Sequence, residues 1–195
     1  MPLGKGKSAE ADGLVAESCS RITALLNEAG VRCHVDDRDY LKPGPKFFHW
    51  ERRGVPLRIE VGPREAEALQ CVVCPRIPPS DKSVLSIEGI GEQVKARLAV
   101  IHETMLAGAK ERLDAGIQPV GDYASMVDAL GSGKAGMFLA PWTEDAAEEE
   151  VVKAECKATI RCYPLDANAA GAVEGKKCFK TGRPATHMAL FARAF

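Results

Sequence analysis

The segment from Val55 to Val61 constrains the fold of this chain more than any other. Apolar and charged residues alternate along it, and glycine and proline bound it on both sides. Because successive side chains of a strand point to opposite faces, this pattern predicts a strand with one apolar face. Arg58 and Glu60 lie on the other face, so the predicted strand combines an apolar side with a charged side.

Strands and helices alternate through the N-terminal part of the chain. Apolar residues at helical spacing predict helices over 12–29 and 87–113, and a proline can open a short helix over 45–53. Alternating and apolar runs predict strands over 31–35 and 69–74. This order of elements is typical of an α/β fold with a mixed sheet.

A second unit is expected to begin near Pro119. Asp122 can cap a short helix that carries apolar residues on one face. The further predicted elements are a strand over 137–140, an acidic helix over 144–155, a strand over 158–163, a loop over 166–186 and an apolar stretch over 189–195.

Composition sets limits on the class of protein. The chain has 195 residues, of which 46% are hydrophobic and 27% charged, so it can bury the core of one large domain or two small ones. No apolar run approaches the length of about 18 residues that a membrane span requires. The net charge of −1 argues against a large phosphate-binding surface but leaves a local basic face open. Seven irregularly spaced cysteines, an odd number, indicate a reducing compartment.

Cys71 and Cys74 have the spacing of a metal or redox motif. They fall in a predicted strand, where residues three apart point to opposite faces and cannot easily share one metal ion or one disulfide. We therefore expect two free cysteines that serve as small buried hydrophobic residues, with a redox role as the alternative.

Two blocks of sequence resemble one family. The first block resembles the anticodon-binding domain of prolyl-tRNA synthetases of the archaeal and eukaryotic type, and the second resembles the extra C-terminal domain of that family. The first block comprises Val35-Asp36-Asp37-Arg38, Pro43-Gly44-Pro45-Lys46-Phe47, Trp50-Glu51 and the run from Gly54 to Arg64. The second comprises Ala140-Pro141-Trp142, the run from Ala158 to Pro164, Gly182-Arg183-Pro184-Ala185 and the run from Leu190 to Phe195.

The resemblance runs from about residue 8 to the end and implies two domains. Residues 1–118 would form an anticodon-binding domain, with a mixed sheet flanked by helices and a truncated first strand. Residues 119–195 would form a small α+β domain. The family joins proline to its tRNA with ATP and magnesium in an upstream catalytic domain, which no residues here match. We therefore expect a fragment that holds no catalytic residue and no cofactor and is inactive alone.

The resemblance also implies which residues contact tRNA(Pro), whose anticodon ends in two guanines in this family. The O6 and N7 acceptors of guanine suit Arg or Lys, and its N–H donors suit a carboxylate. The expected base contacts are Glu51, Arg58, Arg64, Glu65 and Lys82. Glu65 stands where the family commonly has Asp. The expected backbone contacts are Lys42, Lys46 and Arg53, because any positive charge can meet a phosphate.

The residues alone leave simpler alternatives open. Arg58 and Glu60 could form the solvated face of a strand, and Glu51 with Arg53 could be a surface charge pair. Three aromatic residues lie close in sequence to the expected phosphate contacts Lys46 and Arg53. We expect them to pack in the core, and the alternative is that they stack on bases. These are Phe47, Phe48 and Trp50.

The family's C-terminal domain often holds a structural zinc ion with four cysteines. The corresponding positions are Thr143, Glu148, Cys178 and Thr181. One thiolate, one carboxylate and two hydroxyls are a poor ligand set for zinc, so we expect none here. Apolar packing around Trp142, Ile160, Phe179 and Phe191 would then hold this domain.

The implied partners are tRNA(Pro) and the catalytic domain of the same enzyme, with no membrane. A homodimer is expected only for the full-length enzyme. We expect a cytoplasmic location, and the sequence leaves an organellar one open. The alternative to tRNA recognition is a protein-interaction module derived from a synthetase. The third hypothesis is that the chain is a complete enzyme.

Overall fold

The computed structural model describes residues 1–3, 8–78, 80–133 and 136–193. The chain divides into two compact units, Met1–Gly108 and Ala109–Phe195, and the division falls inside one long helix. No helix in the described part of the chain is long and apolar enough to cross a membrane.

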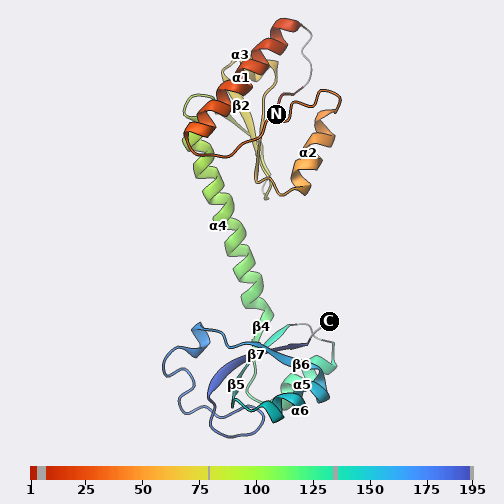
Figure 1. Ribbon diagram of the computed structural model, residues 1–195, viewed down its shortest axis with the longest axis vertical. Coiled ribbons are helices and arrows are strands. Elements are labelled where there is room, and N and C mark those ends of the chain that lie inside the picture. The colour runs from red at the N-terminus through yellow and green to blue at the C-terminus, as the bar shows by residue number, and fades with distance from the viewer. Residues whose placement is uncertain (4–7, 79, 134–135, 194–195) are drawn as a thin grey trace. The chain divides into compact units, whose positions relative to one another are not determined.

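The first unit is a three-stranded antiparallel sheet with helices packed around it (Figure 1). The strand order is β1-β2-β3. Its elements are α1 (Ala9–Glu28), α2 (Pro43–Arg52), β1 (Leu57–Glu60), α3 (Pro63–Glu67), β2 (Gln70–Pro75), β3 (Ser83–Ser86) and the first part of α4 (Ile90–Gly116).

The core of this unit lies between α1, the sheet and the start of α4. One face of α1 carries buried residues at helical spacing, and these meet the apolar faces of β2 and β3. Gly91 lets α4 approach α1 closely, because a Cβ atom there would lie 2.7 Å from the Cβ of Ala29 and 3.0 Å from the carbonyl oxygen of Leu25. The principal buried residues are Val15, Ile22, Leu26, Val61, Val73, Ile87 and Ile90.

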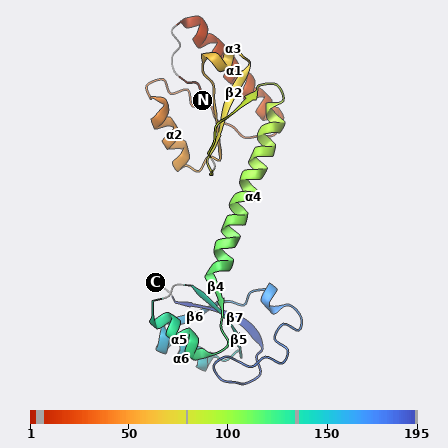
Figure 2. The same ribbon diagram turned by 180° about the vertical axis from the view of Figure 1, so that it is seen from behind.

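The second unit is a four-stranded mixed sheet with the strand order β4-β5-β7-β6. β4 and β5 are parallel, and the other pairs are antiparallel. Helices α5 and α6 lie together on one side of this sheet (Figure 2). The elements are β4 (Ile117–Pro119), α5 (Tyr123–Gly131), β5 (Met137–Trp142), α6 (Ala146–Cys156), β6 (Ala158–Cys162), the 3-10 turn η1 (Asp166–Asn168) and β7 (His187–Arg193).

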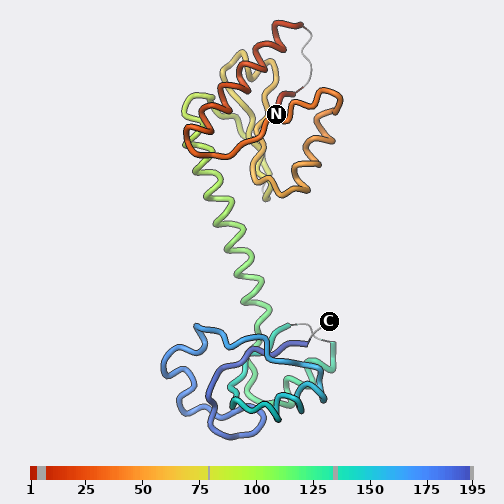
Figure 3. The backbone as a smooth tube through the Cα atoms, viewed as in Figure 1, coloured from red at the N-terminus to blue at the C-terminus, as the bar shows by residue number. Residues whose placement is uncertain are grey.

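The expected aromatic core of the second unit is confirmed. The rings of Trp142, Phe179 and Phe191 are buried and contact one another at centroid distances of 5.2–6.1 Å, and Ile160 packs against them. The mixed α/β class is also confirmed. Between β6 and β7 the chain follows the long irregular course predicted for residues 166–186, broken by η1 (Figure 3).

One predicted strand is wrong, and three short elements were not predicted. Residues 31–35 form no strand, although their side chains alternate in polarity. Alternation produces a strand only where another strand supplies hydrogen-bond partners. The elements missed are α3, β3 and β4, which have only five, four and three residues. Cys71 and Cys74, by contrast, are buried and free on β2, as expected.

Candidate nucleic-acid interface

Arg58 is the centre of a charged cluster in the first unit. It lies on β1, and its side chain is 14% exposed. Its Nε donates to Glu60 at 2.8 Å and its Nη1 donates to Glu51 at 2.9 Å. Burial lowers the pKa of Arg58, but the hydrogen bonds to the two carboxylates outweigh it and the net shift is upward. The guanidinium is therefore charged and fixed in direction.

Glu60 is a buried carboxylate between two cations. Its side chain is 2% exposed, and its second oxygen accepts from Nζ of Lys82 at 2.7 Å. Lys82 precedes β3, so the sheet joins residues that are 22 positions apart. The alternative of a solvated strand face is wrong for Glu60, because a buried carboxylate with two cationic partners is not solvated.

The ring of Phe47 forms the floor of this cluster. It comes from α2, and the guanidinium carbon of Arg58 lies 3.9 Å from its centroid. The ammonium of Lys82 lies 5.8 Å from the same centroid. Cation–π contact of this kind holds a planar guanidinium parallel to an aromatic face. Phe47 is thus part of the cluster rather than of the apolar core, which sequence reasoning missed.

The cluster keeps hydrogen-bonding capacity for a ligand. A guanidinium has five N–H groups, and Arg58 uses two of them on Glu60 and Glu51. Glu51 is 52% exposed, and only one of its oxygens is engaged by Arg58. The arrangement therefore presents unused donors beside a partly exposed acceptor, which is the combination that an edge of guanine requires.

Arg64 and Glu65 lie outside this cluster, on α3. Arg64 is exposed. The carboxylate of Glu65 accepts from the backbone N–H of Gly62 at 3.0 Å and so caps the start of α3. Within the described residues, no hydrogen bond or ion pair joins either side chain to Arg58. The structure brings Glu51, Arg58 and Lys82 together but does not bring Arg64 and Glu65 to them.

The three cations expected to meet phosphate differ in exposure. Lys42 is exposed before the first residue of α2, and Arg53 is exposed just after its last. Lys46 is only 5% exposed, and its Nζ donates to the backbone carbonyl of Asp36 at 3.3 Å. Phosphate contact by Lys46 is therefore not supported, because the ammonium is directed into the protein to hold a loop.

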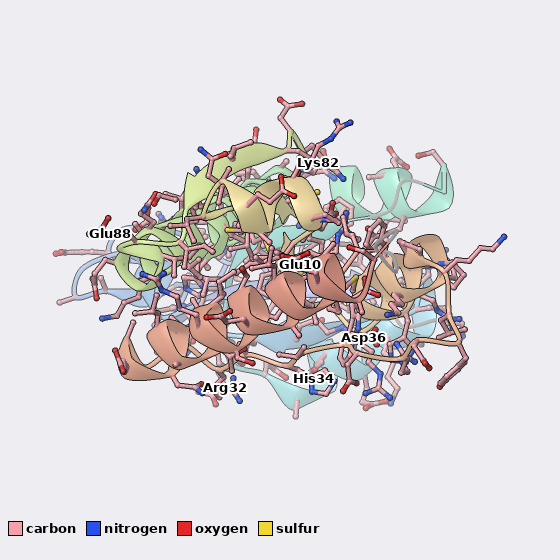
Figure 4. The ribbon with its side chains drawn as sticks, turned by 90° about the horizontal axis from the view of Figure 1, so that it is seen from above. Glu10, Arg32, His34, Asp36, Lys82 and Glu88 are labelled. Carbon is pink, nitrogen blue, oxygen red and sulfur yellow. The ribbon has the colours of Figure 1, made fainter. Side chains whose placement is uncertain are left out.

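Asp36 fixes the segment that leads into α2. Its buried carboxylate accepts two hydrogen bonds from the side chain of Arg38, at 2.8 and 2.6 Å, one from the backbone N–H of Arg38 at 3.3 Å, and one from the indole of Trp50 at 2.7 Å. The bonds from Arg38 hold the pKa of Asp36 well below its usual range. Asp36 and Lys82 lie well apart in the view of Figure 4. The segment is thus held by the ion pair of Asp36 with Arg38, and through Trp50 and Lys46 it positions α2 rather than the cluster directly.

None of the three aromatic residues expected in the core belongs to its buried residues. Phe47 contacts Arg58, as described, and Phe48 is 62% exposed. Trp50 is partly buried through its bond to Asp36 and its contacts with the rings of His34 and His49. The helix presents successive side chains in different directions, so Phe47 and Phe48 cannot share one environment.

The four positions expected for zinc in the second unit carry other interactions. Thr143 donates to the backbone carbonyl of Pro184 at 2.8 Å. Glu148 forms an ion pair of 2.6 Å with Lys180. An ammonium at this distance already neutralises the carboxylate and would repel a second cation.

Cys178 and Thr181 are the other two of the four positions expected for zinc. Burial raises the pKa of the Cys178 thiol, but hydrogen bonds from Thr181 and nearby backbone N–H groups outweigh it, so the net shift is downward. Two hydroxyls, one thiol and a carboxylate paired to lysine do not match the thiolate and imidazole ligands of structural zinc. Among the described residues, no group of three or more His, Cys, Asp or Glu side chains is placed to hold a metal ion.

Comparison with known proteins identifies both units. Residues 1–97 match the family model described as "Anticodon binding domain", and residues 123–195 match "Prolyl-tRNA synthetase, C-terminal". The chain is 37% identical to the chloroplastic/mitochondrial proline–tRNA ligase of Arabidopsis thaliana and 38% identical to the proline–tRNA ligase of Thermococcus kodakarensis. Both alignments cover 100% of this chain but only 35% and 39% of those relatives, so the chain spans little more than a third of their length.

A solved structure gives the same result. The prolyl-tRNA synthetase of Cryptosporidium parvum, crystallised with L-proline and AMP, superposes on this chain with a TM-score of 0.83 at 31% sequence identity. The superposition covers all of this chain and 40% of that one. The chain therefore belongs to the prolyl-tRNA synthetase family and corresponds to its anticodon-binding and C-terminal domains.

Proposed function

We propose that this chain recognises the anticodon of tRNA(Pro) as part of a proline–tRNA ligase. The observation that carries the proposal is the cluster of Glu51, Arg58, Glu60 and Lys82 on the floor of Phe47. Its oriented donors and its exposed carboxylate suit the edges of unpaired guanines. The alternative of a protein-interaction module is not favoured, because the relatives that match over the whole chain are proline–tRNA ligases.

The proposed base contacts are Glu51, Arg58 and Lys82, with Arg64 at the exposed start of α3. Glu65 contributes less in this proposal, because its carboxylate already caps α3. The proposed phosphate contacts are Lys42 and Arg53. Both lie at the ends of α2 and are exposed, so they can meet the backbone on either side of the bases.

The properties of the whole enzyme belong to the same proposal. We propose that the ligase uses ATP and magnesium in a catalytic domain, and that its homodimer involves that domain. The cytoplasmic location also stays a proposal, since one of the relatives is named as chloroplastic/mitochondrial. The domain division at 118/119 is proposed as well, with α4 as the link.

Arg58→Lys tests the assignment without removing the positive charge. Lysine keeps a cation beside Glu60 but loses the planar fork, so a base contact made through two N–H groups is lost. We expect binding to an RNA stem-loop that carries the proline anticodon to weaken by about 1–3 kcal/mol, or roughly 5- to 150-fold. Fluorescence anisotropy measures this change. The melting temperature of the variant shows whether the fold still tolerates the buried carboxylate of Glu60 without its arginine partner.

The matched control is Arg21→Ala, which removes an exposed arginine of α1. It should leave the preference for the proline anticodon unchanged. Equal affinity of Arg58→Lys and the parent chain for this RNA would reject Arg58 as a reader of bases.

A further inference from the structure

Phe48 is a large aromatic side chain that the fold does not use. It lies in the middle of α2 and is 62% exposed, whereas the ring before it in sequence is covered by Arg58. An exposed phenylalanine on a polar helix makes no contribution to a core. Its position next to a candidate RNA site therefore calls for a functional explanation.

The neighbour that the structure places against the ring of Phe48 is a cation. The guanidinium carbon of Arg52 lies 5.7 Å from the centroid of the ring, one helical turn further on. Arg53 and Lys42, also exposed, flank the same short helix. A protein partner would favour a contiguous apolar patch, whereas a single exposed aromatic face beside an arginine, on a helix with a cation at each end, suits a nucleobase and its phosphate.

Phe48 is also continuous with the proposed base-reading cluster. Glu51 is three residues after Phe48, so the two side chains are neighbours on the surface of α2, with Cβ atoms about 5–6 Å apart. The same helix therefore presents Phe47 beneath Arg58, Glu51 at the edge of the cluster, and Phe48 beyond that edge. A nucleotide next to a guanine that contacts Glu51 would meet the surface of α2 that carries Phe48.

We propose that Phe48 is a stacking platform for an unpaired base adjacent to the anticodon bases, and that Arg52 binds the phosphate of that nucleotide. This inference rests on the proposed function. Stacking on an aromatic face does not depend on which base is present, since every base has a flat π surface. Phe48 would therefore add affinity, while the cluster around Arg58 supplies the choice of sequence.

The test uses Phe48→Leu, which keeps an apolar side chain but removes the π face, and Phe48→Trp, which keeps it. Leu106→Ala is the control, because Leu106 is an equally exposed apolar residue (60%) on α4. The probes are anticodon stem-loops of tRNA(Pro) with 2-aminopurine at single loop positions on either side of the anticodon. Affinity and 2-aminopurine fluorescence are measured for each variant of the 195-residue chain.

We expect Phe48→Leu to weaken binding about 5- to 150-fold for RNAs with the proline anticodon and with a changed anticodon alike. Phe48→Trp should bind as the parent does. One 2-aminopurine position should be quenched by the parent and by Phe48→Trp but not by Phe48→Leu.

Unchanged affinity of Phe48→Leu would overturn the inference, as would weaker binding with no 2-aminopurine position that depends on the ring. Altered self-association with unchanged RNA binding would assign the ring to a protein contact instead, which also overturns it. Failure of the proposed function looks different, because the parent chain would then not distinguish the proline anticodon from the changed one.

Discussion

Asp36 shows how one buried residue can control a site that it does not touch. Its carboxylate accepts hydrogen bonds from Arg38 and Trp50. Its backbone carbonyl accepts one from Lys46. Trp50 and Lys46 both belong to α2, so this network fixes the helix that carries Glu51 and Phe47. The loss of the carboxylate charge should loosen α2 and thereby the orientation of the cluster.

The stability that Asp36 provides should depend on pH. Because the pKa of Asp36 is lower in the folded chain than its usual value of 3.8, the ionised form stabilises the fold above that value. This contribution is lost as the pH falls below 3.8 towards the folded-state pKa. We expect Asp36→Asn to lower stability by about 1–3 kcal/mol at pH 7, because hydrogen bonds to a charged group are lost.

Urea unfolding at pH 7 and at acidic pH checks this expectation. The difference between Asp36→Asn and the parent should shrink as the pH falls below 3.8. The exposed neighbour gives the control, since Asp37→Asn should change stability little at either pH. A difference for Asp36→Asn that stays constant across this range would show that the charge of Asp36 does not stabilise the fold.

The residues of the cluster were easier to predict than their surroundings. The alternation around Arg58 identified the charged face of β1, and the resemblance pointed to Glu51 and Lys82. The burial of Glu60 could not be predicted from its neighbours in sequence, because its partner Lys82 is 22 residues away. The burial of Lys46 was missed for the same kind of reason, since its partner is a backbone carbonyl ten residues earlier.

At the scale of elements, long helices were predicted well and short pieces were not. Helices α1 and α4 carry apolar residues over several turns, so their periodicity is visible in sequence. The short α3, β3 and β4 carry too few residues to show a period. Residues 31–35 have the pattern of a strand but form none. Alternating polarity alone therefore does not produce a strand when no neighbouring strand pairs with the segment.

The loop before β7 is joined to the first turn of α6 and its N-cap by two ion pairs, one of which involves Glu148, a position where the family often has a zinc ligand. Lys180 is 11% exposed and forms its 2.6 Å pair with Glu148, and Arg183 pairs with Asp145 at 2.6 Å. We expect Lys180→Met to lower the melting temperature measurably, because a partly buried carboxylate loses its partner. Lys153→Met removes an exposed pair with Glu150 and should have little effect.

The same measurement tests the expectation about zinc. A metal that binds only the folded chain raises its melting temperature, and a chelator lowers it. We expect neither zinc nor EDTA to shift the melting temperature of the parent. A rise with zinc that is abolished by Cys178→Ser would contradict this reading of the ligand set.

At the scale of the whole molecule, the chain carries two of the domains of a larger family. Both units match prolyl-tRNA synthetases, and the chain spans 35–40% of the length of the relatives described. Each unit has its own core and sheet, with α4 running through the division between them. The proposed anticodon contacts all lie in the first unit, so the proposal can be tested on this chain directly.

The most direct test of the account compares two RNAs by fluorescence anisotropy at two salt concentrations. One is tRNA with the proline anticodon, and the other is the same tRNA with both anticodon guanines changed. We predict tighter binding to the proline anticodon, with a ratio of affinities that persists at the higher salt concentration. Equal affinities that fall together with salt would mean phosphate contact alone, and would contradict the claim that the cluster around Arg58 reads bases.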